Sequence, residues 1–171
     1  MRNLLKYIFR FIFFVVIQTM VLNQLEVGFG IHPMIYPLFI VLLPFDFKVI
    51  PTMFLAFSMG ICIDIMSNTY GLHTSSLLLV AYLRPLIYKA LSPRDGYDPI
   101  KEGSMYDMGH LWFLYAFGSL IMVHHFWFFA IEMFKFNEIG YILRKTFVSI
   151  PVSYLFCVLY QMIFIKKEKI K

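Results

Sequence analysis

Long apolar runs, separated by short polar segments, fill most of this chain of 171 residues. A membrane-spanning helix needs about 20 mostly apolar residues. Soluble domains are about 45–50% apolar, whereas this chain is 60% hydrophobic. We therefore expect one all-α integral membrane domain over residues 1–171, with a polar loop at 92–109. The apolar runs predict six transmembrane helices, over about residues 4–25, 28–44, 49–66, 72–91, 110–134 and 141–165.

The second run is the weakest of the six. It is short and contains Pro33 and Pro37. A proline inside a helix removes a backbone hydrogen bond, and a short run crosses a bilayer poorly. The segment could instead be tilted or re-entrant, and the sequence leaves these alternatives open.

The distribution of basic residues predicts the orientation of the chain. With six helices, both termini, the second loop and the fourth loop share one side of the membrane. Cytoplasmic loops carry the excess of Lys and Arg, so both termini should be cytoplasmic. The net charge of +5 then suits the anionic inner leaflet and requires no nucleic acid partner. This side collects 11 of the 15 basic residues: Arg2, Lys6, Arg10, Lys48, Lys89, Arg94, Lys101, Lys166, Lys167, Lys169 and Lys171.

The polar loop at 92–109 has two interpretations. Pro93, Gly96 and Pro99 favour turns at PRDG and YDPI in a solvated loop. The two tyrosines make the loop less polar than a passive linker needs to be, which would suit a docking site for a cytoplasmic partner.

The stretch DIMSNTYGLH, residues 64–73, places an acid, a glycine and a histidine between two apolar runs. Gly71 can adopt the positive φ angle that a tight turn needs. Asp64 ends one helix, where the helix dipole disfavours an anion, so we expect a nearby donor. His73 and the free amides that start the next helix are the candidates. Asp64 and His73 then form a structural clasp of the hairpin or contact a partner or ligand, and catalysis has the least support.

Arg84 lies in the apolar run that follows His73. Arg84 is 11 positions after His73, which places it about 16 Å further along a helix, too far to pair with Asp64. We expect its guanidinium to extend toward the cytoplasm, or to bond carbonyls freed by Pro85.

The stretch HHFWFFAIEMF contains His124, His125 and Glu132. His125 and Glu132 are seven residues apart and share one helix face. Zinc sites on a single helix use ligands at i and i+4, and the residue at i+4 from His125 is Phe129. We expect a polar stripe that faces other helices or a partner, with Lys135 pairing with Glu132, rather than a metal site.

The sequence contains no familiar enzyme signature. It has no Walker phosphate loop, no G-x-S-x-G and no zinc-protease motif. Cys62 and Cys157 lie inside apolar runs, which predicts buried side chains rather than a disulfide or a zinc site. We therefore expect neither enzymatic activity nor a cofactor.

The run GICIDIMSNTYGLHTSSLLLVAYLRP resembles the signature of the bacterial rod shape-determining protein MreD family. The matching residues are Asp64, which ends one helix, Gly71 and His73 in G-x-H, and Tyr82 and Arg84 in the helix that follows. PRDGYD and HHFWFFAIEMF are similar to the form of the family found in Bacteroidetes-type bacteria. The turn SNTYG departs from the family, which usually has a turn rich in small residues.

This resemblance implies a non-enzymatic scaffold of the cell-elongation complex in the bacterial inner membrane. Members bind MreC, a single-span protein with a periplasmic coiled coil. Through it they connect MreB filaments to RodA and its class B penicillin-binding protein, which synthesise peptidoglycan. The fold would be similar to the substrate-binding subunits of energy-coupling-factor transporters. The implied partners are thus an MreC-like protein, the elongation machinery and membrane lipid.

The alternative function is the substrate-binding subunit of a small-molecule (vitamin) importer, which shares the six-helix plan. It would need a polar pocket near the outer end, which Asp64, His73, His124 and His125 could line. It would also need a cytoplasmic coupling surface, typically Ala-rich, and the sequence has no A-x-x-x-A pattern. The sequence therefore favours the scaffold.

Overall fold

The computed structural model describes residues 2–25, 28, 30–134 and 138–165. These residues contain helices and no strand, with one isolated antiparallel bridge between Pro44 and Glu102. The helices are α1 (Arg2–Met20), the 3-10 helix η1 (Leu22–Gln24), α2 (Pro37–Val41), α3 (Val49–Ser67), α4 (Leu72–Ala90), α5 (Met105–Met108), α6 (His110–Met133) and α7 (Ile139–Phe164).

Four of the described helical segments are long and apolar enough to cross a membrane, which indicates an all-α membrane protein. α4 has 19 residues but includes Arg84 and Lys89, and it does not reach the same apolarity. Four of the six predicted spans thus meet this criterion. The four segments are Leu4–Gln24, Val49–Ser67, His110–Met133 and Ile139–Phe164.

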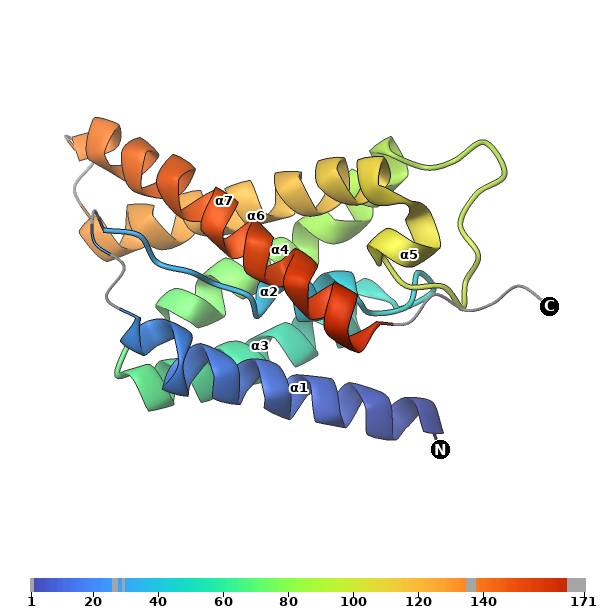
Figure 1. Ribbon diagram of the computed structural model, residues 1–171, viewed down its shortest axis with the longest axis horizontal. Helices are drawn as coiled ribbons and strands as arrows, with labels where there is room; N and C mark the ends of the chain where they lie inside the picture. Colours follow the sequence, from blue (N-terminus) through green and yellow to red (C-terminus); the bar gives the residue numbers. More distant parts are fainter. Residues whose placement is uncertain (1, 26–27, 29, 135–137, 166–171) are drawn as a thin grey trace.

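The long helices run roughly along one direction (Figure 1). α3 and α4 form an antiparallel pair, α4 packs against α6, and α6 packs against α7, while α1 packs against α3. One end of the bundle holds the α3–α4 turn, and we call it the hairpin end. The start of α1, the end of α7 and the loop before α5 share the opposite end, the termini end (Figure 1).

The α3–α4 hairpin is tight because two residues adopt left-handed conformations. Asn68 has φ 55° and Gly71 has φ 85°. The two helices also approach closely at Gly60, where an added Cβ would collide with the Cα of Thr74. Small residues at such crossings let membrane helices pack closely.

The second predicted helix, 28–44, is wrong. Residues 31–35 are irregular, and only the five residues of α2 are helical. Pro37 takes the first position of α2, where its missing N–H does no harm, and a proline disfavours helical conformation in the residue before it. The segment runs from the hairpin end through the centre of the bundle, and every residue from Met34 to Leu43 is buried.

We call residues 31–44 the central segment. Side chains from neighbouring helices form hydrogen bonds with its backbone. The Gln18 side chain accepts from the Ile35 amide at 3.0 Å and donates to the Pro33 carbonyl at 3.0 Å. Ser153 of α7 accepts from the Met34 amide at 2.9 Å. Non-helical backbone inside a membrane is stable only when protein groups provide such partners. The central segment is therefore a structural part of the core.

The other boundaries agree better with the prediction. α3, α4, α6 and α7 each begin and end within two residues of the predicted limits, whereas α1 gives way to η1 after Met20. In the loop, residues 92–96 are exposed, as the solvated interpretation requires. Glu102, Gly103, Ser104 and Met105 are buried, so that interpretation is wrong for residues 102–105.

Candidate functional site

Asp64 binds together the two helices of the hairpin. It is only 7% exposed, and its Oδ1 accepts from the Thr69 hydroxyl at 2.7 Å and the His73 amide at 3.0 Å. Its Oδ2 accepts from the Thr74 amide at 2.9 Å and the Thr74 hydroxyl at 2.5 Å. A carboxylate has about four acceptor positions, so this network leaves none for a ligand. We call these contacts the hairpin clasp.

The clasp provides hydrogen-bond acceptors for the free amides at the start of α4. Gly71, the residue before α4, offers no side-chain cap, and the first amides of a helix have no partner within the helix. Asp64 caps them from the preceding helix, so its charge faces the positive end of the α4 dipole. The free amides are thus the donors, one of the two possibilities that the sequence indicates.

The His73 side chain points to a different partner. Its Nδ1 lies 2.9 Å from the Tyr36 hydroxyl, and that hydroxyl lies 2.6 Å from Nε2 of His124. Tyr36 and His124 are fully buried and His73 is 3% exposed. A phenol can donate one bond and accept another, so Tyr36 links α4 to α6 through the central segment.

His125 has a separate and complete set of bonds. Its Nδ1 lies 3.0 Å from the Ile121 carbonyl, which accepts only, so Nδ1 carries the proton. The neutral ring then accepts at Nε2 from Ser153, 3.0 Å away, and Ser153 accepts from the Met34 amide. His125 thus helps hold the central segment against α6 and α7.

The remaining predicted residues lie elsewhere. Gly71 is in the turn, and Tyr82 is 55% exposed without a hydrogen bond among the described residues. Glu132 accepts from Lys145 at 2.7 Å, while the predicted pairing with Lys135 lies outside the described residues. The basic tail 166–171 also lies outside them. Within the described residues, no three His, Cys, Asp or Glu side chains gather as metal ligands would.

Arg84 is buried rather than extended toward water. Its Nη2 donates to the carbonyls of Leu43 and Pro44 at 2.6 and 2.8 Å, and Tyr88 donates to the Val41 carbonyl at 3.2 Å. The guanidinium thus reaches toward the termini end, but it does not reach water as a snorkelling side chain would. The guanidinium does bond carbonyls, but they belong to the end of the central segment and not to the turn before Pro85.

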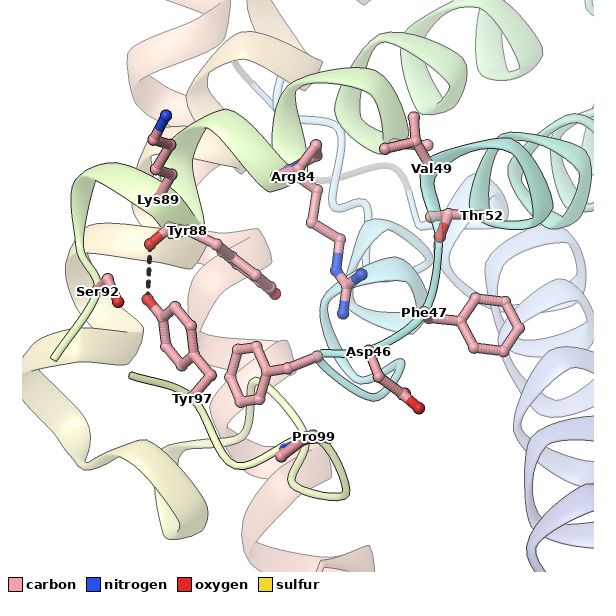
Figure 2. Close-up of a pocket in the computed structure, with 13 residues that line it drawn as sticks. Asp46, Phe47, Val49, Thr52, Arg84, Tyr88, Lys89, Ser92, Tyr97 and Pro99 are labelled. Atoms are coloured by element: carbon pink, nitrogen blue, oxygen red, sulfur yellow. Dashed lines mark hydrogen bonds between the residues drawn. The ribbon is translucent and has the colours of Figure 1, made fainter. Parts of the chain in front are cut away.

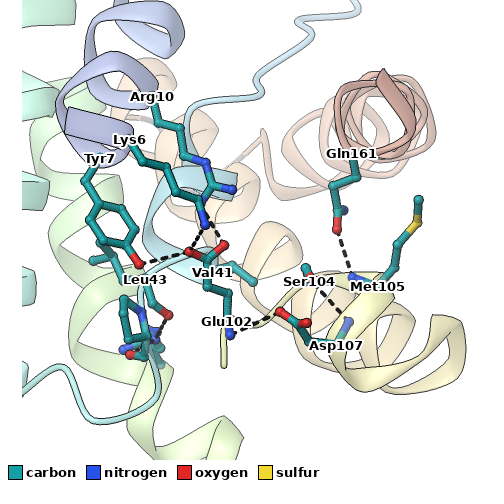
Figure 3. Close-up of polar contacts among 12 residues, drawn as sticks. Lys6, Tyr7, Arg10, Val41, Leu43, Glu102, Ser104, Met105, Asp107 and Gln161 are labelled. Atoms are coloured by element: carbon teal, nitrogen blue, oxygen red, sulfur yellow. Dashed lines mark hydrogen bonds and ion pairs between the residues drawn. The ribbon is translucent and has the colours of Figure 1, made fainter. Parts of the chain in front are cut away.

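A buried charge cluster at the termini end was not apparent from the sequence. Glu102 accepts from Lys6 and Arg10 at 2.7 Å each and from Tyr7 at 2.9 Å (Figure 3). Ser104 caps α5 by accepting from the Asp107 amide, and Gln161 of α7 accepts from the Met105 amide at 2.8 Å. These bonds fasten the second half of the loop to α1 and α7.

Some missed residues carried a signal in the sequence. Gln18 and Arg10 are polar residues within an apolar helix, and such residues usually have a buried partner. Ser149, Ser153 and Cys157 recur every four residues on α7, which places them on one face. Tyr36 and Glu102 carry no comparable pattern, because their partners are remote in sequence.

No family model, curated protein or solved structure matches this chain.

Proposed function

We propose that this protein is a non-enzymatic scaffold of the bacterial cell-elongation complex, of the MreD type, which binds a single-span MreC-like partner. The observation that carries the proposal is the closed hairpin clasp. Asp64 and His73, which carry the resemblance, are buried in the hairpin, and Gly71 turns the chain between its two helices. All acceptor positions of Asp64 are filled from within the hairpin, which favours a role in shaping a surface for a protein partner over direct binding of a ligand by this carboxylate.

A groove beside the clasp supports this proposal. It has a volume of about 490 Å³ and follows the α3–α4 seam. Its apolar lining consists of Phe57, Ile61, Ile65 and Leu78, and the rest consists of Asp64, Gly71, Thr74 and Ser75. Phe57 is 45% exposed and Ile65 is 76% exposed. A partner's membrane helix would bury these side chains, and the clasp fixes the relative position of both walls.

The arrangement of the ends supports the proposed topology. The start of α1, the end of α7 and the loop before α5 share one end, and most of the basic residues that the structure describes lie toward that end. In the bacterial inner membrane this end would face the cytoplasm and MreB, and the hairpin end would face the periplasm. RodA and its class B penicillin-binding protein would join through the MreC-like partner.

The importer alternative has weaker support. It requires a polar pocket near the hairpin end, yet Tyr36, His73 and His124 bond to one another and are nearly or completely buried. We also propose that the arrangement of the helices is similar to that of energy-coupling-factor subunits. This similarity concerns the fold and not the function.

Co-purification tests the proposal. Tagged protein would be extracted in mild detergent from its native membrane, and its partners identified by mass spectrometry. We expect a single-span protein with a periplasmic coiled coil, together with peptidoglycan synthases. Recovery of an ATPase pair with a coupling subunit would replace the scaffold with the importer.

A matched pair of variants tests the groove. Phe57→Ala removes a groove side chain, and Phe147→Ala removes a 57% exposed phenylalanine of α7 that does not line the groove. Truncating an interface anchor typically costs more than about 1 kcal/mol, or roughly fivefold in affinity. Partner recovery should fall with Phe57→Ala alone. Equal recovery from both variants would place the partner on another face.

A further inference from the structure

A cavity of about 360 Å³ opens at the termini end, away from the hairpin clasp (Figure 2). It lies between the start of α3, the second half of α4 and the loops at 44–48 and 92–99. Phe45, Tyr88 and Tyr97 form an aromatic wall, and Tyr97 donates to the Tyr88 carbonyl at 2.8 Å. Arg84 and Lys89 bring positive charge to the cavity.

Arg84 gives this cavity an unusual electrostatic character. The residue is 3% exposed, and its Nε has no hydrogen-bond partner. Its guanidinium lies 4.8 Å from the Tyr88 ring, and among the described residues it forms no ion pair. A buried cation is costly without a counter-charge, and two carbonyls provide only partial compensation. The cavity therefore favours an anion.

The start of α3 contributes in the same direction. Val49, the first residue of this 19-residue helix, lines the cavity, and Lys48 before it provides no side-chain cap. In α3 only the amides of Val49 and Ile50 are free, because Pro51 has no N–H and the Thr52 amide donates to the Lys48 carbonyl at 3.1 Å. These two amides carry the positive end of the helix dipole. Anions, phosphate above all, bind at such positions.

One acidic residue lines the cavity, and its negative charge would repel an anion if the two lay close together. Asp46 extends from the 44–48 loop, and its carboxylate points away from the Arg84 guanidinium (Figure 2). Lys89 stands at the rim on an exposed turn of α4. The positive charge inside the cavity thus comes from Arg84 and the free amides of α3. The rim carries one negative charge, Asp46, and one positive charge, Lys89.

We propose that this cavity binds an anionic phosphate group, recognised by Arg84 and the free amides of α3. The planar guanidinium suits phosphate, and the volume accommodates more than a single carboxylate. The phosphate would come from a phospholipid headgroup or from a soluble phosphate compound. Ile50 and Leu86, next to cavity residues, are 81% and 57% exposed and would meet the acyl chains of a lipid. This inference is independent of the scaffold proposal.

Two probes separate the sources. Full-length protein is purified in detergent, and binding of phosphatidylglycerol relative to phosphatidylcholine is measured by native mass spectrometry. Inorganic phosphate is tested separately, by its effect on the unfolding temperature. Arg84→Gln should weaken binding more than about tenfold, since a charged hydrogen-bonding group is lost.

Two rim variants carry the test, because Arg84→Gln also removes two carbonyl contacts and can unfold the protein. Lys89→Gln should weaken binding about threefold, and Asp46→Asn should strengthen it about threefold, as expected for exposed charges. Lys101→Gln is the control, because it removes an exposed charge at the same end that does not line the cavity.

Each outcome decides the proposal. Selective retention of phosphatidylglycerol with this pattern of variants supports the proposal with a lipid source. Stabilisation by inorganic phosphate with the same pattern, without lipid selectivity, supports it with a soluble source. If neither probe binds, or if Lys89→Gln and Asp46→Asn behave like Lys101→Gln, the proposal is wrong and Arg84 serves only to cap carbonyls.

Discussion

Among the residues that the structure describes, each end of the bundle contains one buried carboxylate, and the two are stabilised in different ways. Asp64 at the hairpin end accepts only from amides and hydroxyls, all within ten residues along the chain. Glu102 at the termini end accepts from Lys6, Arg10 and Tyr7, more than 90 residues away. The first carboxylate is a local cap, and the second is a long-range ionic connection.

This difference has consequences for the function of each end. The hairpin clasp can form as soon as α3 and α4 meet, so it sets the shape of one surface independently of the other helices. The Glu102 cluster forms only when α1 and the loop before α5 come together. The termini end should therefore be the more sensitive to loss of a single charge.

The largest effect is expected for Glu102→Ala. Arg10 is 5% exposed, and removing its carboxylate leaves a buried cation without a partner. Breaking a buried pair costs about 3–5 kcal/mol of stability. Unfolding in detergent measures the loss, and the double variant Arg10→Gln with Glu102→Gln should recover much of it. No recovery would show that the pair does not act as a unit.

Asp64→Asn should cost less, about 2–3 kcal/mol. With an NH2 group in place of Oδ2, the backbone amide of Thr74 loses its acceptor, whereas the Thr74 hydroxyl can turn and accept from the NH2 group. The remaining side-chain oxygen still accepts from Thr69 and the His73 amide. The same unfolding assay measures the change. A loss equal to that of Glu102→Ala would erase the distinction between a local cap and a long-range ion pair.

Gly60→Ala tests the close packing next to the clasp. The new Cβ would meet the backbone of Thr74, which can move only with α4, so we expect a loss of about 2 kcal/mol. Gly118→Ala is the matched control, because nothing lies within 4 Å of its added Cβ. A neutral Gly60→Ala would mean that the hairpin accommodates wider spacing.

The smallest effect is expected for Thr69→Val. It removes one of the four donors to Asp64 and leaves the shape of the side chain nearly unchanged. A single neutral partner contributes about 1 kcal/mol. If the loss matches that of Asp64→Asn, the clasp depends on the turn rather than on the start of α4.

The sequence predicts the local features of this fold and misses those that depend on distant partners. Apolar runs locate α3, α4, α6 and α7. The dipole argument correctly predicts a nearby donor for Asp64, but it leaves open whether the donors are the His73 side chain or the free amides of α4. Pro33 and Pro37 indicate that the second run is a poor helix. They do not indicate that Gln18 and Ser153 would stabilise irregular backbone there. The roles of Tyr36 and Glu102 depend on contacts between distant segments, which a single sequence does not reveal.

Photo-crosslinking in native membranes tests the central claim most directly. A photoreactive amino acid would replace Phe57 in the groove, with the exposed Phe147 of α7 substituted in the same way as the control. The scaffold account predicts that position 57 captures a single-span protein with a periplasmic coiled coil and that position 147 does not. Capture of lipid alone at both positions, or of a transporter coupling subunit at position 57, would contradict it.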